Sequence, residues 1–336
     1  MARLVHAIAV ISDLHFGEAP DINPAPYDLQ ITSKIPRTRF SPLVDKIFVH
    51  GCRPHDGRIT SELKRNLMRI ALQLNQEGLA LDLRMPFDFL LVLGDITTFP
   101  TPTAVKNAHE FLCGGTFCDP FDDRLGLGTM SDRLLVVPGN HDKLATGIDL
   151  KELRAMFGPA VPEGSAPLFV RRQSPTGSDF LFLLMDSNTY HPIYPFTTQS
   201  LKHIASGNIS QPTVDQVVDA LTKIKNGRAG GEFSGLKYHT AHKFVLLHHP
   251  VRLAEFYHPF HPYSWFVPHG CSGTQALMSA LRGEGFIALH GHVHKAWRHK
   301  SHHNHVVSVG STTQFHDGHD LRNDFPILKI IDSGEV

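Results

Sequence analysis

Residues 4–17 read LVHAIAVISDLHFG, and this stretch sets the architecture that we expect for the rest of the chain. Leu4–Ile11 is a short apolar run rich in Val and Ile, which is typical of a strand that is buried on both faces. The run leads directly into Asp13 and His15, so a carboxylate and an imidazole follow a predicted strand. Side chains at positions i and i+2 of an extended segment leave on the same side, so these two can converge on one centre or on neighbouring centres.

The same pattern recurs four times along the chain. Each time an apolar run is followed by Asp, Asn or His, usually beside Gly. In the first half of the chain, Phe89–Leu93 is followed by Gly94-Asp95, and Leu134–Val137 by Gly139-Asn140-His141-Asp142. In the second half, Phe244–Leu247 is followed by His248-His249-Pro250, and Phe286–Leu289 by His290-Gly291-His292-Val293-His294. Glycine at such a position allows a sharp turn and a close approach of the backbone to a metal or phosphate. In open α/β sheets the carboxyl ends of the strands form the edge where ligands bind. We therefore expect these polar side chains to meet at one edge.

Helical patterns alternate with the predicted strands. Ser61–Glu77 carries its apolar residues on one face, with a serine cap at its start and Gly78 as a stop. Further helices are expected over Thr103–Leu112, Asp149–Phe157, Thr213–Lys225 and Thr274–Leu281, and further strands over Phe180–Met185 and His305–Val309. Strands that alternate with helices predict an α/β or α+β layered domain.

Composition narrows the possible functions. Lys plus Arg number 32 and Asp plus Glu number 32, so no long-range positive field attracts nucleic acid. Four cysteines without a C-x-x-C pair argue against a disulfide framework or a structural zinc site and favour a cytoplasmic location. No apolar run approaches the roughly 18–20 residues that span a bilayer, so we expect no membrane partner. Histidine is abundant, at 24 of 336 residues.

The chain shows no internal repeat and no low-complexity linker, so we interpret residues 1–336 as a single domain. Two long segments resist assignment to helix or strand. The proline-rich segment 16–59 is interpreted as an insertion, which could narrow the site, decorate the surface or form an oligomer contact. The aromatic and His-rich segment 256–273 is interpreted as a loop near the site, which could stack a base or form a packed hydrophobic cap. The sequence does not define the oligomeric state.

The residue types at the five strand ends are those of a metal site. Carboxylate, carboxamide and imidazole groups without thiolates suit Mn, Fe, Zn and similar ions. Seven such groups exceed one tetrahedral site, which predicts two ions that share a bridging carboxylate. Two ions about 3.5–4 Å apart can clamp a phosphoryl group and generate hydroxide near neutral pH.

The five motifs, in this order, resemble those of the calcineurin-like metallophosphoesterases. The resemblance extends from about Val5 to about Gly310, which is nearly the whole chain. Within the superfamily, the Ser12–Gly17 segment and the His248-His249-Pro250 step are most similar to the small class III cyclic-nucleotide-type phosphodiesterases. The resemblance implies an α/β fold in the form of a four-layered α/β/β/α sandwich, with a dinuclear metal site at the carboxyl ends of the strands.

The resemblance also implies a role for each motif residue. One ion would be held by Asp13, His15 and His294, the other by Asn140, His248 and His292, and Asp95 would bridge the two. His141 would face the substrate and stabilise or protonate the leaving oxygen, or else orient a ligand. His249 would support a ligand or contact phosphate. Asp142 would orient His141, or it could equally be an exposed turn carboxylate. The two ions would be divalent or of mixed valence, drawn from Mn, Fe and Zn.

The implied function is dinuclear-metal-dependent hydrolysis of a small phosphate ester, with a nucleotide-type or other small phosphodiester favoured. A phosphomonoesterase is the nearest alternative. A nuclease is disfavoured by the zero net charge. A non-catalytic scaffold of the same fold would be expected to lack some of the ligands or His141, and the sequence retains all of them.

Overall fold

The computed structural model describes residues 3–16, 57–76, 87–97, 102–114, 126–143, 150–162, 164, 166–188, 206–251, 271–293, 296–300, 305–310, 315–316, 320–321 and 326–332. The predicted ligand His294 lies outside these ranges. So do most of the two long segments, 16–59 and 256–273, whose predicted roles stay predictions.

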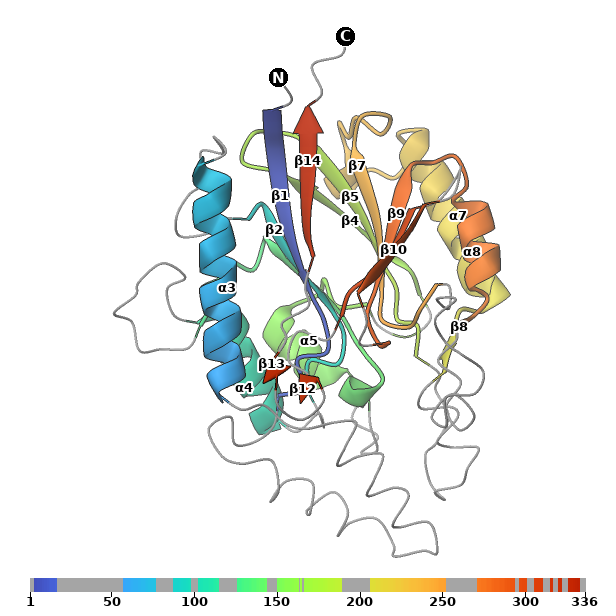
Figure 1. The fold of residues 1–336 in the computed structure, drawn as a ribbon. Helices are drawn as coiled ribbons and strands as arrows, with labels where there is room; N and C mark the ends of the chain where they lie inside the picture. The colour runs from blue at the N-terminus through green and yellow to red at the C-terminus, as the bar shows by residue number, and fades with distance from the viewer. Residues whose placement is uncertain are drawn as a thin grey trace, which may run out of the picture.

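The first sheet has the strand order β14-β1-β2-β3. Its three parallel strands, which the sequence predicts, are β1 (Arg3–Ile11), β2 (Phe89–Leu93) and β3 (Leu134–Val137). The edge strand β14 (Ile327–Asp332) pairs with β1 in the antiparallel sense and was not predicted. β1 begins and β14 ends at the top of Figure 1, so the carboxyl ends of the parallel strands point downwards.

The second sheet has the strand order β10-β11-β9-β7-β5-β4. Its parallel centre consists of β5 (Asp179–Leu184), β7 (His242–Leu247), β9 (Phe286–His290) and β11 (His305–Ser308). The unpredicted strands β4 (Leu168–Gln173) and β10 (Trp297–Lys300) form its antiparallel edges. Two small sheets pair β6 (Gly207–Asn208) with β8 (Cys271–Ser272) and β12 (Phe315–His316) with β13 (Asp320–Leu321).

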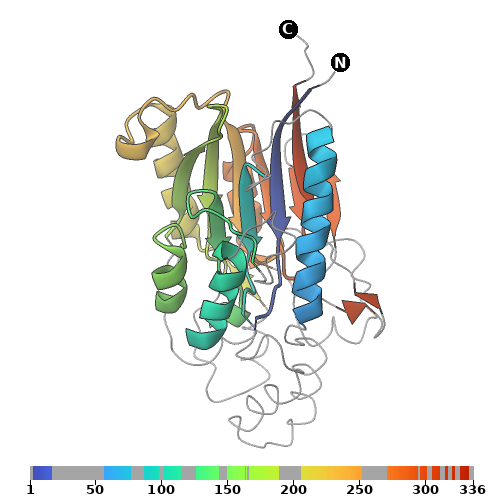
Figure 2. The ribbon, with the colours of Figure 1, turned by 90° about the vertical axis from the view of Figure 1, so that its left-hand side faces the viewer.

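Helices cover the outer face of each large sheet, as Figures 1 and 2 show. The first sheet is covered by α3 (Gly57–Gln76), α4 (Pro102–Cys113) and α5 (Lys151–Phe157), and the second by α7 (Gln211–Lys225) and α8 (Thr274–Ala280). The predicted start of the first helix was wrong: α3 begins at Gly57, so Ser61 lies inside it. α7 begins two residues before the predicted start, and Ser210 caps it by accepting a bond from the Thr213 amide at 3.3 Å.

A third core lies between the two sheets. Ile8 and Val10 of β1 face a group of stacked phenylalanines from the second sheet. The ring centroids of Phe180 and Phe182 are 6.1 Å apart, and those of Phe182 and Phe244 are 5.6 Å apart. Because the central strands are buried on both faces, their sequences are almost continuously apolar. These layers confirm the predicted α/β/β/α sandwich.

Within the described part of the chain, every helix is too short or too polar to span a lipid bilayer.

Candidate metal centre

The loops after β1 and β2 are joined by backbone hydrogen bonds that continue the parallel pairing of the strands. The amides of Asp13 and His15 donate to the carbonyls of Gly94 and Asp95 at 3.0 and 2.9 Å. Asp13, His15 and Asp95 have φ angles of 55°, 51° and 49°, and His292 after β9 has 69°. A positive φ is uncommon for residues other than glycine and costs of order 1–3 kcal/mol, so such positions cluster at functional sites. Four of the seven predicted ligands share this strained conformation.

Glycines beside the predicted ligands allow the loops to approach one another closely. A Cβ atom added at Gly139 would lie 2.1 Å from Asp95 Oδ1. A Cβ atom added at Gly291 would lie 1.9 Å from Ser12 Oγ and 2.9 Å from Asp13 Oδ2. These contacts explain why glycine stands in these motifs: the backbone of one loop packs against the carboxylate of another.

Four predicted ligands from four loops converge in one cluster. His248 Nε2 lies 2.9 Å from Asn140 Oδ1 and 3.3 Å from Asp95 Oδ2. His292 Nδ1 lies 3.1 Å from Asn140 Oδ1 and 3.2 Å from His248 Nε2. The structure therefore brings together a carboxylate, an amide oxygen and two imidazole nitrogens, and it does so across the boundary between the two sheets.

The orientation of His248 suits a metal ligand. Its side chain is fully buried, and Nδ1 lies 2.8 Å from the Leu93 carbonyl oxygen, to which it donates a proton. This bond fixes the ring and directs Nε2 into the cluster. Metal-binding imidazoles are commonly held in this way, with the second nitrogen bonded to a carbonyl or carboxylate.

The buried Asp95 and His248 are electrostatically coupled. Burial by itself would raise the pKa of Asp95, but His248, His141 and His15 hold that pKa well below its usual value. Burial would likewise lower the pKa of His248, but Asp95 raises it to about 9. Asp95 and His248 therefore stabilise each other's charged forms.

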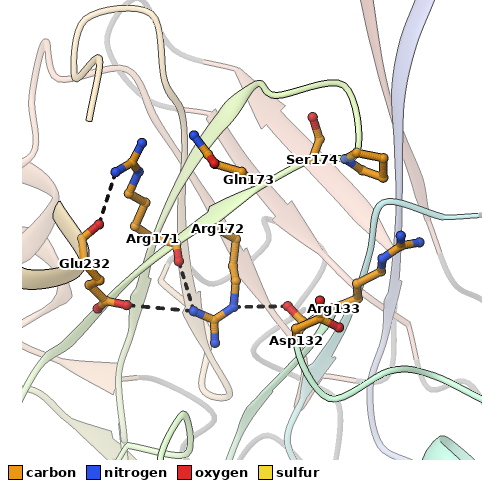
Figure 3. Close-up of a pocket in the computed structure, with 8 residues that line it drawn as sticks. Asp132, Arg133, Arg171, Arg172, Gln173, Ser174 and Glu232 are labelled. Carbon is orange, nitrogen blue, oxygen red and sulfur yellow. Dashed lines mark hydrogen bonds and ion pairs between the residues drawn. The ribbon is translucent and has the colours of Figure 1, made fainter. Parts of the chain in front are cut away.

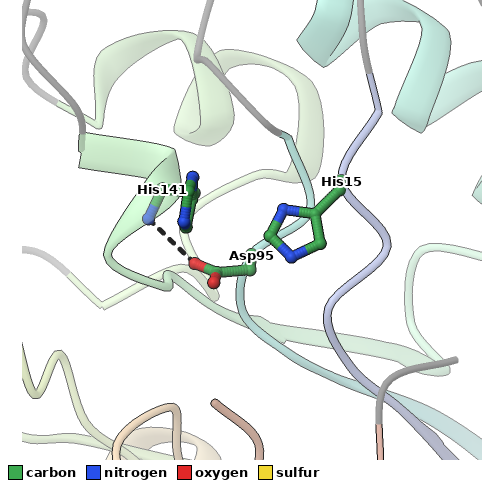
Figure 4. Close-up of side chains that lie close together, drawn as sticks. All are labelled: His15, Asp95 and His141. Carbon is green, nitrogen blue, oxygen red and sulfur yellow. Dashed lines mark hydrogen bonds between the residues drawn. The ribbon is translucent and has the colours of Figure 1, made fainter. Parts of the chain in front are cut away.

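Asp95 also belongs to a second group, whose other members are His15 and His141; Figure 4 shows this group. One potential ligand atom from each of these three residues lies within 4.8 Å of the others. The His141 amide donates to Asp95 Oδ1 at 2.8 Å, and the rings of His15 and His141 meet edge to face at 4.9 Å. Asp95 is thus shared between two donor groups, as a bridging carboxylate requires.

The donor atoms of both groups are chemically suited to metal ions. The described residues supply six of the seven predicted ligands, namely Asp13, His15, Asp95, Asn140, His248 and His292. Asp13 is tied to the cluster because its Oδ2 accepts a bond from the His292 amide at 3.2 Å. Oxygen and imidazole ligands without thiolates fit Mn, Fe or Zn.

Asp142 is a buried residue and not the exposed turn carboxylate that we considered as one alternative. It is 2% exposed, and its carboxylate accepts bonds from the amides of Ile96, Thr97 and Gly139 at 3.2, 2.8 and 2.9 Å. Burial and the nearby Asp95 raise its pKa to about 6. Asp142 therefore ties the loop after β3 to the loop after β2.

Three residues that follow β5 also reach the site, and the sequence reasoning missed them. Ser187 Oγ lies 3.0 Å from His249 Nδ1 and accepts a bond from the His249 amide at 3.2 Å. The His249 ring lies 4.6 Å from the His292 ring, so Ser187 supports His249 behind a predicted ligand. The sequence pattern that marks the other motifs is present here too, because Asp186-Ser187-Asn188 follows the apolar run of β5.

A separate cavity of about 430 Å³ lies beside β4 and the turn that precedes β3; its lining residues are Asp132, Arg133, Arg171, Arg172, Gln173, Ser174, Pro175 and Glu232. Figure 3 shows that two of its arginines, Arg171 and Arg172, have internal partners. Arg171 donates to Asp179 Oδ1 at 2.7 Å and to the Ser234 carbonyl at 2.6 Å. Arg172 donates to the Asp132 carbonyl at 3.1 Å and lies 3.9 Å from Glu232. This cavity offers no ligand set of the kind seen around Asp95.

No protein-family model and no curated protein sequence matches the chain. Among solved structures, it is similar to a dimetal phosphatase from Danio rerio, with 14% identity, a TM-score of 0.42, and coverage of 92% of this chain and 88% of that one. It is also similar to phosphopantetheinyl hydrolase from Mycobacterium tuberculosis, with 12% identity, a TM-score of 0.37, and coverage of 91% and 89%. A third similar structure is the anchor in the inner membrane complex of Plasmodium, with 9% identity, a TM-score of 0.43, and coverage of 97% and 81%. These similarities are too distant to support a function, which has to come from the side chains.

Proposed function

We propose that this chain is a phosphate ester hydrolase that uses two metal ions held at the carboxyl ends of its strands. The observation that carries the proposal is the position of Asp95. Its carboxylate lies 3.3 Å from His248 Nε2 in one donor group and belongs, with His15 and His141, to another. A single buried carboxylate shared by two sets of nitrogen and oxygen donors is suited to bridging two cations.

The assignment of the ligands follows the two groups. Asp13, His15 and His294 would hold one ion, Asn140, His248 and His292 the other, and Asp95 would bridge them. When bound, such a pair of ions neutralises the charge of a phosphoryl group and lowers the pKa of water towards neutrality.

The remaining residues of the site position the reacting groups. The bond from the His141 amide to Asp95 Oδ1 places His141 beside the bridging carboxylate. We assign to its ring the role of stabilising or protonating the leaving oxygen, as a neighbouring hydrogen-bond donor can do. Asp142 supports this arrangement, because it fixes the loop that carries Asn140 and His141.

The substrate that we propose is a small phosphodiester, with residues 1–336 forming one catalytic domain. The preference for a diester rests on the sequence resemblance at Ser12–Gly17 and His248-His249-Pro250 alone. The zero net charge disfavours a nucleic acid as the substrate.

A turnover assay tests the proposal. The metal-free protein is supplied in turn with Mn, Fe, Co and Zn and assayed with bis(p-nitrophenyl) phosphate and p-nitrophenyl phosphate. We expect metal-dependent hydrolysis that is faster with the diester. Faster hydrolysis of the monoester would replace the phosphodiesterase with a phosphomonoesterase. Binding of two ions without hydrolysis of either compound with any metal would favour the non-catalytic scaffold over the enzyme.

A further inference from the structure

The carboxyl end of β5 carries a buried ion pair that the motif analysis did not include. The Asp186 side chain is fully buried and pairs through Oδ2 with Lys143 Nζ. Its Oδ1 accepts two further bonds from Asn188, at 3.1 Å from the amide and 2.8 Å from Nδ2. Every oxygen of this carboxylate is therefore engaged, and each partner is itself part of a loop at the site.

These contacts hold one short segment at both of its ends. Asn188 Nδ2 also donates to the Pro138 carbonyl at 3.2 Å, so the start of segment 138–143 is attached to the end of β5. Lys143, at the other end of the segment, is attached through Asp186. Between the two anchors lie Asn140 and His141, one a predicted ligand and the other the predicted leaving-group contact.

We propose that Asp186 is a positioning residue for this site. It acts through Lys143 and Asn188, and it fixes segment 138–143 from the side of the second sheet, while Asp142 fixes the same segment from the side of β2. Without Asp186, the segment loses the attachment that keeps Asn140 against His248 and His141 against Asp95. The inference rests on the proposed function, because it names the support of the same site.

The first residue of β5 provides a matched control for Asp186. Asp179 also forms a buried ion pair, with Arg171 at 2.7 Å. The Asp179 side chain is 7% exposed and the Arg171 side chain 13%. The Lys143 side chain is likewise 13% exposed. The partners of Asp179 are Arg171, Gln173 and the Lys237 amide, none of which carries a predicted ligand. Asp179→Asn and Asp186→Asn therefore remove equivalent charges from opposite ends of one strand.

Hydrogen exchange of the metal-free protein tests the positioning role without any activity measurement. In Asp186→Asn we expect the amides of residues 139–143 to exchange faster than in the wild type, while the amides of the central strands keep their protection. In Asp179→Asn we expect no change over 139–143. If the exchange rate over 139–143 rises equally in both variants, or if exchange rises equally over the whole chain, Asp186 only stabilises the fold in general. Either result would overturn the inference.

Kinetics at saturating metal provide the second readout. We expect Asp186→Asn to lower kcat by about 10- to 100-fold and to leave KM within about threefold, as the loss of a supporting contact behind a ligand does. Asp179→Asn should retain the wild-type kcat. Equal kcat values for the two variants would contradict the inference, whereas an inactive wild type would contradict the proposed function and leave the exchange experiment valid.

Asn188→Ala is the second variant, in case Asp186→Asn does not fold. It removes the bond to Pro138 without leaving a buried charge unpaired. We expect faster exchange over 139–143 and a lower kcat, in the same direction as for Asp186→Asn. Wild-type exchange and kcat in this variant would show that the end of β5 does not position the segment.

Discussion

Asp95 combines three unusual properties in one residue: it is buried, its φ angle is 49°, and its carboxylate contacts both His248 and the His141 amide. Replacement by Asn keeps the shape but removes the negative charge that two cations would share. We expect Asp95→Asn to lose bound metal and turnover together, as measured by elemental analysis and by the diester assay. Asp219→Asn, which removes an exposed carboxylate of α7, should change neither quantity.

His141 should separate catalysis from metal binding. We assign its ring to the leaving oxygen and not to either ion, so His141→Ala should retain both metals and lose about 100-fold in kcat, as the loss of a proton donor or acceptor does. The exposed His239 provides a control in which the same substitution should leave kcat unchanged. A wild-type rate for His141→Ala on the diester would contradict the role that we assign to it.

Gly139 tests the close packing of the loops. In Gly139→Ala the new methyl group would lie 2.1 Å from Asp95 Oδ1, so either the carboxylate or the loop has to move. We expect reduced metal affinity by calorimetric titration. Gly177→Ala is the control, because its φ angle of 84° strains the backbone while no atom lies within 4 Å of the added carbon. Gly177→Ala should lower the free energy of unfolding by about 1 kcal/mol and leave the metal affinity unchanged.

The sequence identified individual site residues where a local pattern carried the information. Five ordered motifs, each after an apolar run, together selected Asp13, Asp95 and His248 as candidate ligands. The burial of Asp142 could not be predicted, because it depends on the amides of Ile96 and Thr97 in a different loop. Asp186 was missed because it lacks the His or Gly neighbours that drew attention to the other motifs.

At the level of elements, prediction succeeded for strands that are buried on both faces. β1, β2, β3 and β7 are largely apolar, and the structure places each within three residues of its predicted bounds. The antiparallel edge strands β4, β10 and β14 were missed, because they are partly exposed and their sequences mix polar with apolar residues. The start of α3 was misplaced because a serine inside a helix looks the same in sequence as a serine that caps one.

The aromatic packing between the sheets should dominate the stability of the sandwich. Phe182 is fully buried, and its ring lies 5.6 Å from Phe244 and 5.3 Å from Phe89 across the inter-sheet core. We expect Phe182→Ala to lower the free energy of unfolding by about 3–5 kcal/mol in denaturant titrations, because it leaves a cavity that cannot collapse. Val218→Ala on the exposed face of α7 should change it by less than about 0.5 kcal/mol.

For the molecule as a whole, the candidate metal centre joins the two sheets. Asp13, His15, Asp95 and Asn140 follow strands of the first sheet, and His248 and His292 follow strands of the second. Metal binding should therefore stabilise the whole fold, by about 2.7 kcal/mol at a free metal concentration of 100 times Kd. We expect the chelated protein to melt at a lower temperature than the loaded protein. Asp95→Asn should melt at the same temperature with and without metal.

Acid should destabilise the protein through carboxylates far from the metal centre. Burial would raise the pKa values of Asp179 and Glu284, but bonds from Arg171 and Lys225 respectively hold both below their usual values. The folded protein therefore binds fewer protons than the unfolded chain near pH 4. The stabilisation that these carboxylates provide is complete above their unfolded pKa values of about 4 and is lost as the pH falls through the folded values.

The melting temperature of the metal-free protein should accordingly fall as the pH drops below about 4. Asp179→Asn should have a lower melting temperature at pH 7 and a weaker dependence on pH over that range. If the variant and the wild type lose stability in parallel on acidification, Asp179 does not contribute to the acid sensitivity.

The most direct test is anomalous diffraction from crystals of the protein loaded with Mn or Zn. We predict two peaks about 3.5–4 Å apart, one on each side of the Asp95 carboxylate, with His248 and His292 beside one peak and His15 beside the other. The absence of both peaks from a crystal of fully loaded protein, with the side chains around Asp95 directed away from one another, would contradict the account.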